Sequence, residues 1–474
     1  MIHRRKCFVA SLVLALAHPV FASPAEKPGA GELRLITLDP GHFHAALFQK
    51  EMLPGVSPRA SVYAPFGPDL ILHLNRVVAF NLRKDNPTRW ELDIHAAPDF
   101  MERMLKDRPG NVVVLSGRGH GKIARIQACV EAGLHILGDK PWILDPADLP
   151  LVEKALLTAE KQDVVAYDGM TQRFEISCIL QREMVGDPAI FGAPLPGSET
   201  TPTVYMESVH HIMKLVAGAP NLRPVWFFDT EQYGEGLSDL GTHLVDLVQW
   251  TLFPDQALDW RKDIEVIRGS HWPTVLTREQ FQRVTGETDF PESLKANVKN
   301  DRLEYFCNDR VHYTIRGIHT TLDVIWNYEA PPGLGDTETA IFRGSRSRVD
   351  VLQGKEQNFI PELYVVPNRP EDKDAVLAAV RRKVAALQSA WPGVAVQDLG
   401  ARIWVTIPAQ HRVGHEAHFA LLIKRFLGYV RDPKSLPAWE KPNMLAKYCV
   451  TTRGVELARQ FPPSHSLGTA DIHR

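Results

Sequence analysis

Short apolar segments alternate with amphipathic segments between residues 33 and 167 of this 474-residue chain. The apolar segments have the length of buried strands, and the segments between them repeat apolar residues at helical spacing. Parallel strands joined by helices form right-handed crossovers, so the pattern predicts a doubly wound α/β sheet. The expected strands are 33–38, 60–63, 111–115, 134–137 and 164–167, and the expected helices are 45–51, 99–106, 122–132 and 149–161.

After about residue 170 the pattern changes to longer segments in which apolar and polar residues alternate. This alternation is typical of strands with one buried face, and it indicates a second domain. The expected strands are 204–209, 320–328, 339–343 and 359–366. Two insertions are expected, at 259–291 and as a charged helix at 372–388, and a helix at 416–430 is expected to close the core of the second domain.

Two motifs bring together side chains that can carry chemistry. Lys140 follows the apolar run 134–137, at the carboxyl end of an expected strand, which is the edge where open α/β sheets bind ligands. About a hundred residues later, a glycine-rich turn leads into a helix that presents Asp239, His243 and Asp246 on one face. A lysine, an aspartate and a histidine can together move a proton from a substrate hydroxyl while a hydride leaves. We predict that Lys140, Asp239 and His243 are catalytic and that Asp246 is structural.

Each of these residues also has an ordinary structural interpretation. Lys140 could be a surface lysine, Asp239 could cap the helix that follows it, and His243 could be a buried histidine of the core. The pairing of the two motifs in one chain favours the catalytic interpretation.

The two motifs resemble those of the glucose–fructose oxidoreductase, inositol dehydrogenase and MocA-like family of oxidoreductases. That family has Glu-Lys-Pro after a strand and a glycine-rich turn that leads into Asp-x-x-x-His, whereas Asp139 replaces the glutamate here. The resemblance extends over about residues 33–250. It implies oxidation of a secondary hydroxyl of a sugar, polyol or glycoside by a nicotinamide cofactor, and in that family either the lysine or the histidine has been assigned the proton transfer.

The resemblance also implies the domain organisation. We predict a Rossmann-type nucleotide-binding domain at 32–170 and an α+β domain at 171–460, which has an open, mainly antiparallel sheet and carries the substrate. In the family this sheet often packs against a partner subunit, so a homo-oligomer is expected.

The nucleotide-binding turn departs from the Gly-x-Gly-x-x-Gly pattern of such domains. The corresponding segment, 39–45, keeps only Gly41, and the acid expected after the second strand is missing, with Asp69 as its nearest substitute. No basic residue occupies that position, which favours NAD and does not exclude NADP. The residues expected to contact the cofactor are Gly41, His42, Phe43, His44, Asp69, Ser116, Gly117, Arg118, His120, Asp139 and Lys140.

Substrate contacts are expected from polar and aromatic residues near the second motif, because aromatic faces stack on sugar rings while polar groups bind hydroxyls. These residues are His210, His211, Arg223, Trp226 and Tyr233. Trp226 could instead belong to the core. The histidines at 42, 44, 120, 210 and 211 could bind a metal, but no acid shares the spacing of a metal motif, so no metal is expected.

The composition excludes some classes of partner. The 54 Lys and Arg residues nearly balance the 56 Asp and Glu residues, so no strong field attracts nucleic acid or an anionic membrane. The balance favours a small neutral partner, such as a carbohydrate substrate. None of the five cysteines lies in a metal-ligand spacing, and none is expected to be catalytic.

The N-terminus predicts export to the periplasm or the exterior. Basic residues at 3–6, an apolar run at 7–17 and small residues up to Ala22 match a signal peptide that is cleaved after residue 22. The alternative is a membrane anchor, but the apolar run is shorter than the roughly 20 residues that a spanning helix needs.

Export restricts the chemistry, because free NAD is scarce outside the cytoplasm. We therefore expect a tightly bound cofactor and a redox-neutral reaction, which either couples two sugars or oxidises a glycoside transiently so that its bond can be cleaved. Because the turn at Gly41 is poor in glycine, a cofactor-free sugar-binding protein is the remaining alternative.

Overall fold

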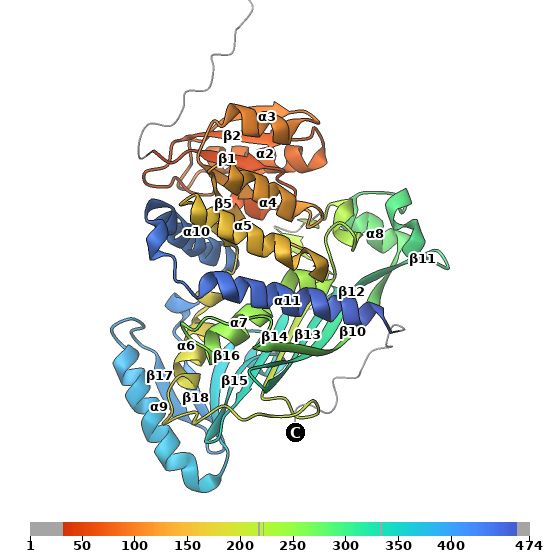
Figure 1. The fold of residues 1–474 in the computed structure, drawn as a ribbon. Coiled ribbons are helices and arrows are strands. Elements are labelled where there is room, and N and C mark those ends of the chain that lie inside the picture. The colour runs from red at the N-terminus through yellow and green to blue at the C-terminus, as the bar shows by residue number, and fades with distance from the viewer. Residues whose placement is uncertain (1–31, 217–218, 221, 332–333, 462–474) are drawn as a thin grey trace, which may run out of the picture.

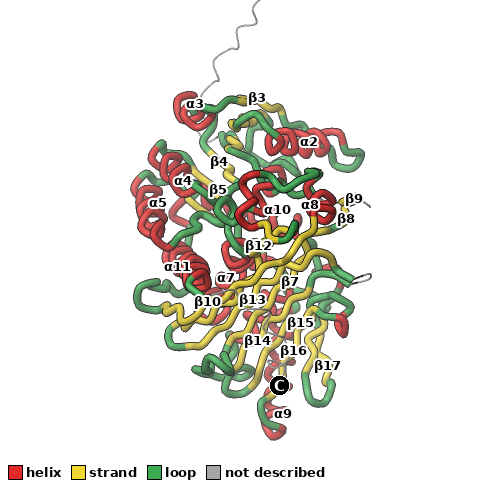
Figure 2. The backbone as a smooth tube through the Cα atoms, turned by 90° about the vertical axis from the view of Figure 1, so that its right-hand side faces the viewer, coloured by secondary structure: helices red, strands yellow, loops and turns green. Residues whose placement is uncertain are grey.

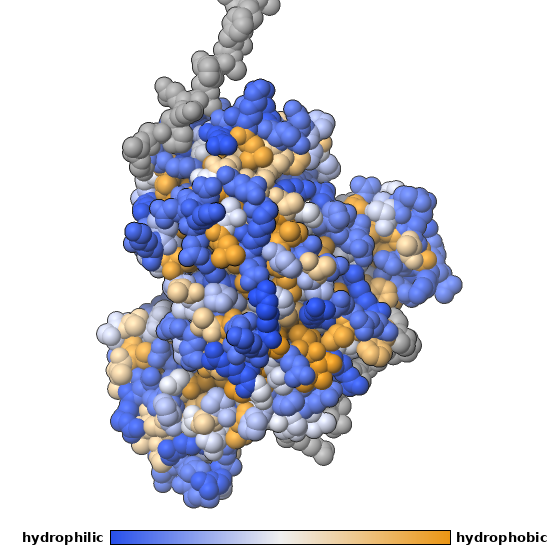
Figure 3. All heavy atoms as spheres, in the orientation of Figure 1, coloured by the Kyte–Doolittle hydropathy of each residue, from blue (hydrophilic) through white to orange (hydrophobic). Residues whose placement is uncertain are grey.

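The computed structural model describes residues 32–216, 219–220, 222–331 and 334–461, which form two large sheets with a long helix, α11, between them (Figure 1). The predicted signal peptide lies outside the described residues. None of the described helices is long and apolar enough to cross a membrane. On the face shown in Figure 3, apolar side chains are scattered among hydrophilic ones.

The first sheet has six parallel strands in the order β3-β2-β1-β4-β5-β6. Its central strands, β1 and β4, are apolar except for Thr37 and are fully buried, as is typical of strands covered on both faces. The strands are β1 (Leu35–Leu38), β2 (Arg59–Ala64), β3 (Glu91–Ala96), β4 (Val112–Leu115), β5 (His135–Gly138) and β6 (Ala166–Asp168). The helices are α1 (His44–Leu47), α2 (Pro68–Leu82), α3 (Phe100–Asp107), α4 (Lys122–Glu131) and α5 (Leu149–Lys161). The predicted doubly wound sheet is confirmed, and its strand order reverses between β1 and β4, where such sheets bind ligands.

The prediction missed one helix beside this sheet, α2, and one of its strands, β3. Only Leu70, His73 and Val77 are buried in α2, so its apolar periodicity is weak. β3 is an edge strand that leaves Ile94 exposed, and its sequence therefore lacks a clear buried face.

The second sheet has ten strands, which run β10-β12-β13-β7-β14-β15-β16-β18-β17 with β11 beside β12 (Figure 2). Its described pairs are antiparallel except β7 with β13, so the predicted open, mainly antiparallel sheet is confirmed. The strands are β7 (Val204–Met213), β10 (Ile264–Thr277), β11 (Val298–Lys299), β12 (Arg302–Ile315), β13 (Ile318–Glu329), β14 (Thr337–Arg343), β15 (Ser347–Gln353), β16 (Glu362–Pro367), β17 (Ala395–Asp398) and β18 (Ile403–Thr406). A small separate hairpin consists of β8 (Leu215–Val216) and β9 (Ala219–Pro220).

The remaining helices are α6 (Ile176–Val185), α7 (Thr242–Leu252), α8 (Arg278–Thr285), α9 (Lys373–Leu387), α10 (His415–Arg431) and α11 (Glu440–Arg459). A π-helical turn, Leu237–Gly241, directly precedes α7. The segment 259–291, expected as an insertion, contains α8 and also β10, which pairs with β12 and so belongs to the sheet itself.

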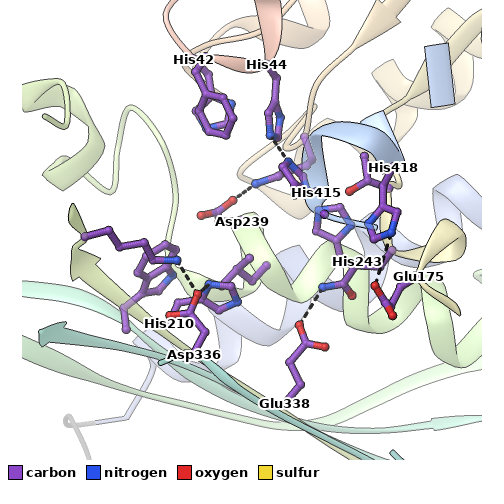
Figure 4. A pocket seen from close by; sticks show the side chains of 18 of the residues that line it. His42, His44, Glu175, His210, Asp239, His243, Asp336, Glu338, His415 and His418 are labelled. Atoms are coloured by element: carbon purple, nitrogen blue, oxygen red, sulfur yellow. Dashed lines mark hydrogen bonds and ion pairs between the residues drawn. The ribbon is translucent and has the colours of Figure 1, made fainter. Parts of the chain in front are cut away.

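The expected helix at 416–430 is present as α10, but the expectation that it closes the second core was wrong. Its residues Phe419, Leu422 and Phe426 pack in one core with Leu35 of β1 and Val112 of β4. The sequence shows that this helix has an apolar face, but not which sheet the face covers. The return of α10 to the first sheet brings its N-terminal histidines to the junction between the two sheets (Figures 1 and 4).

A buried ionic network also joins the parts of the molecule. Arg173 binds Asp246 of α7 through two contacts of 2.6 Å, and it binds Glu440 of α11 at 2.8 Å. Lys447 of α11 lies 2.6 Å from Asp168 at the end of β6. All five side chains are buried, so each charge depends on its partners.

Candidate active site

A cavity of about 480 Å³ opens beside the carboxyl ends of the first sheet and is closed on other sides by the second sheet and by α10 (Figure 4). Nine of the predicted site residues line it, which are His42, Phe43, His44, Lys140, His210, Arg223, Tyr233, Asp239 and His243. They come from segments that are far apart in sequence, so the fold itself assembles the cavity.

Lys140 and Asp239 bind each other directly at the cavity wall. The Lys140 ammonium donates to the Asp239 carboxylate, and both side chains are buried. Burial alone would raise the pKa of Asp239, but the Lys140 charge beside it lowers the pKa below its usual value. Asp239 is therefore a carboxylate, and its contact with Lys140 connects the end of β5 to the π-helical turn.

The π-helical turn is positioned by β12. A Cβ atom on Gly236 would lie 2.4 Å from the carbonyl oxygen of Cys307, so only glycine fits there. The backbone N–H of Leu237 donates to the carboxylate of Asp309 at 2.9 Å. These contacts fix the start of the helix that carries Asp239 and His243.

His243 lies on the first turn of α7 and faces the same cavity. Burial and the nearby Lys140 charge lower the pKa of His243 to about 3, so its imidazole is neutral at physiological pH. Its Nδ1 atom has no hydrogen-bond partner among the described residues. A neutral imidazole with a free nitrogen can accept a proton. Asp246, by contrast, belongs to the buried network with Arg173, as its structural interpretation requires.

Asp139 holds the turn that follows β1. One oxygen of its buried carboxylate lies 3.0 Å from Nδ1 of His42, 3.0 Å from Nδ1 of His44 and 2.7 Å from the Ser116 hydroxyl, which donates to it. Burial would raise the pKa of Asp139, but His44 and His42 lower it well below its usual value. These four residues were all expected to contact a cofactor, and in the structure their polar groups bind one another.

The backbones after β1 and β4 lie close together at the switch point. Asp39 adopts a left-handed conformation with φ of 46°, and Gly41 and Gly117 lie face to face. A Cβ atom on Gly117 would lie 2.9 Å from the Asp39 carbonyl oxygen, so a larger residue is excluded. The missing side chains therefore let the backbones after β1 and β4 pack directly against each other.

Trp226 covers Gly41 at this point. A Cβ atom on Gly41 would lie 3.0 Å from the indole ring of Trp226. The indole N–H donates to Asp69 at 2.9 Å, and the Arg118 guanidinium lies 3.0 Å from the same carboxylate and 5.1 Å from the indole ring centroid. Trp226 was expected to bind substrate, but its ring instead lies against the predicted nucleotide turn.

Two further predicted residues do not line the cavity. His120 is exposed, and its backbone N–H donates to Gln232. His211 is buried beside Asp336, at 3.0 Å, while His210 lines the cavity and lies 3.2 Å from the same carboxylate.

The prediction missed several polar groups that line the cavity, which are Glu175, Lys214, Asp336, Glu338, His415 and His418. His415 lies 2.9 Å from His44, although the two residues are 371 positions apart. Burial, with Glu175 and Asp336 nearby, raises the pKa of Glu338 to about 7. No local motif identifies these residues, because each reaches the cavity only through the packing of β7, β14, α6 or α10.

Two groups of described residues place possible metal ligands close together. The ligand atoms of His42, His44 and Asp139 lie within 4.8 Å of one another, as do those of Glu235, His271 and Asp309. Hydrogen bonds within the first group account for its geometry. The expectation that no metal binds stays a prediction.

Comparison with known proteins gives the family. Residues 180–459 match the family described as "Putative oxidoreductase C terminal domain". A crystal structure of a "putative oxidoreductase" from Parabacteroides merdae is 44% identical, with a TM-score of 0.87 over 91% of this chain and 98% of that one. No protein with a curated function matches this sequence.

Other solved structures share the fold at low identity. Levoglucosan dehydrogenase, in complex with NADH and levoglucosan, is 13% identical, with a TM-score of 0.56 over 90% of this chain and 97% of that one. GenD2 from gentamicin A biosynthesis, in complex with NAD, is 15% identical, with a TM-score of 0.53 over 95% of this chain and 97% of that one.

Proposed function

The chain belongs to the oxidoreductase family that this C-terminal domain defines, and from that premise we propose that it oxidises a secondary hydroxyl of a sugar, polyol or glycoside. We also propose that the protein is a member of the glucose–fructose oxidoreductase, inositol dehydrogenase and MocA-like group. The observation that carries it is the meeting of Lys140, Asp239 and His243 at one cavity beside the ligand-binding edge of the first sheet.

The proposed roles follow from charge and position. His243 is neutral and accepts the hydroxyl proton, and Lys140 stabilises the negative charge that develops on the substrate oxygen. Asp239 orients Lys140 through their direct contact. Because the Lys140–Asp239 pair is buried, its effect on a bound oxygen is larger than it would be in water.

A nicotinamide cofactor, NAD in preference to NADP, is proposed as the hydride acceptor. Gly41, Phe43 and Gly117 would hold it at the switch point, with Asp69 and Arg118 at the edge. The NAD and NADH complexes of the two dehydrogenase-fold relatives support this choice. Gly41 and Gly117 allow the two strand-end turns to pack closely, and nucleotide would bind against this pair of turns.

The first test is whether nucleotide remains bound to the purified protein. If the protein is exported and its cofactor cannot exchange, mature protein should contain about one nicotinamide nucleotide per chain. Mass spectrometry and absorbance of the material released by denaturation measure this directly. Added NAD should not raise the rate of the reaction that this protein catalyses.

Trp226 gives a second prediction for nucleotide retention. Because its indole covers Gly41 and is held by Asp69, Trp226→Ala should release nucleotide at least about tenfold faster than the unchanged protein. Stopped-flow exchange against a fluorescent NADH analogue measures the rate. Trp391→Ala is a suitable control, since that indole lies against His411 at the periphery. Equal release rates in both variants would remove Trp226 from the nucleotide site.

Export, if it occurs, favours a redox-neutral reaction, either between two sugars or through a transient keto glycoside. The cover over Gly41 favours a second candidate, which is a cofactor-free sugar-binding protein. Protein that is free of nucleotide as isolated, binds no NAD or NADP in calorimetry and still binds a carbohydrate would favour that candidate.

A further inference from the structure

The permanent cations of the cavity are not all neutralised. Among the described lining residues these cations are Lys140, Lys214 and Arg223. Lys140 binds Asp239, and Lys214 binds Asp336. Arg223 has no carboxylate within ion-pair distance in the described part of the chain.

Arg223 is held by contacts that leave most of its donors free. Its guanidinium carbon lies 4.9 Å from the Phe227 ring centroid and 5.5 Å from the Trp326 centroid. Its Nε–H donates to the carbonyl oxygen of Ile212 at 3.3 Å. The two terminal nitrogens make no hydrogen bond to any residue that the structure describes. The side chain is therefore fixed by stacking while its outer edge faces the cavity.

The Arg223 guanidinium is partly exposed and has no acidic partner of its own among the described residues. Burial lowers the pKa of Arg223, with only partial compensation from Tyr233 and Asp239. Asp239 is already bound by Lys140, so the negative charge of Asp239 is largely neutralised. A ligand that brings a negative charge to this edge would supply the missing partner.

We propose that Arg223 binds an oxyanion of the substrate, so that the ligand is an acidic sugar bearing a carboxylate, sulfate or phosphate group. This inference rests on the proposed function. An acidic ligand replaces the neutral partner that was expected from the total charge of the chain. The total charge does not show whether one group in the cavity lacks a counterion. The planar guanidinium can present two parallel donors to such a group.

The cavity also holds two acids without a lysine or arginine partner, Glu175 and Glu338, and burial raises the pKa of both, which reduces their negative charge near neutral pH. Glu175 lies beside His418, and Glu338 accepts from Gln172 at 3.3 Å. In Figure 4, Glu175 and His418 lie across the cavity from His210 and Asp336. The strongest electrostatic effects on Arg223 come from Tyr233, Asp239, Tyr305 and Asp336, of which the two acids are each bound by a lysine.

Calorimetry of the purified protein with four sugars tests the proposal. The probes are glucose, glucuronate, glucose 6-sulfate and glucose 6-phosphate at one fixed salt concentration. At least one acidic sugar should bind about tenfold more tightly than glucose. Arg223→Gln should reduce that ratio to about one, Arg223→Lys should keep part of it, and the exposed control Arg261→Gln should keep all of it.

The outcomes separate this inference from the proposed function. If no acidic sugar binds the unchanged protein more tightly than glucose, the inference is overturned, whatever the variants do. A preference that persists in folded Arg223→Gln overturns it as well. Oxidation of neutral sugars without preference for acidic ones would overturn the inference alone. Arg223-dependent binding of an acidic sugar by protein that binds no NAD or NADP would support the inference and overturn the proposed oxidoreductase function.

Discussion

Lys140→Met should lower turnover by at least about a hundredfold while the fold is retained. The methionine has similar length, so the cavity wall is kept, but the charge that stabilises the substrate oxygen is lost. The change also leaves the buried Asp239 carboxylate without its ammonium partner. Single-turnover rates and circular dichroism of the variant measure the two effects separately.

Comparison with His243→Ala extends this test. Since Lys140 and His243 are proposed to act on the same hydroxyl, the double variant should be little slower than the slower single variant. Lys154→Met is the control, because that lysine is exposed and its ion pair with the exposed Glu131 is a long contact of 3.7 Å. Near-normal turnover in both single variants would remove the proposed site, and strictly additive losses would assign the two residues to separate steps.

The largest loss of stability is expected from Asp246→Ala. This change leaves Arg173 with Glu440 alone and removes a neighbour of Lys447, in a region where all of these groups are buried. Removing one member of a buried ion pair typically costs about 3–5 kcal/mol, because the partner charge stays desolvated. Urea unfolding should show this loss, whereas Asp301→Ala, which breaks the exposed pair with Arg278, should cost less than about 1 kcal/mol.

The contribution of Asp246 should also depend on pH. Burial would raise the pKa of Asp246, but the Arg173 and Lys447 charges lower it below its usual value. A carboxylate with a lowered pKa in the folded state stabilises the protein above its unfolded pKa of about 3.9. This contribution is lost as the pH falls below about 4 toward the folded pKa. Asp246→Ala should therefore flatten the acid limb of the stability profile, and an unchanged limb would contradict the assignment.

The sequence predicted the parts of the fold and site that depend on local pattern. The alternation of apolar runs, such as those of β1 and β4, with amphipathic segments predicted the parallel sheet, and both strands are buried throughout. The placement of Lys140 after β5 and of Asp239 at a helix start brought these two residues correctly to one site.

Contacts between distant segments could not be predicted in the same way. The apolar face of α10 is visible in the sequence, but its packing on the first sheet is not, and His415 was missed for that reason. Trp226 was assigned to substrate because its position in the sequence precedes the glycine-rich turn, whereas its partner, Asp69, is 157 residues away. Arg223 was identified as a candidate, but its lack of a counterion appears only when the cavity charges are paired in space.

The most direct test of the oxidoreductase assignment is the transfer of deuterium from substrate carbon to bound nucleotide. Purified protein would be mixed with a sugar that it turns over and in which deuterium replaces every carbon-bound hydrogen. Denaturation would stop the reaction within one turnover. The account predicts that mass spectrometry of the released nucleotide shows the reduced form with one deuterium, and that Lys140→Met protein shows almost none. Samples stopped at successive times within the first turnover would follow the label. Nucleotide that is oxidised and unlabelled at every one of these times while the sugar is converted would contradict the oxidoreductase assignment.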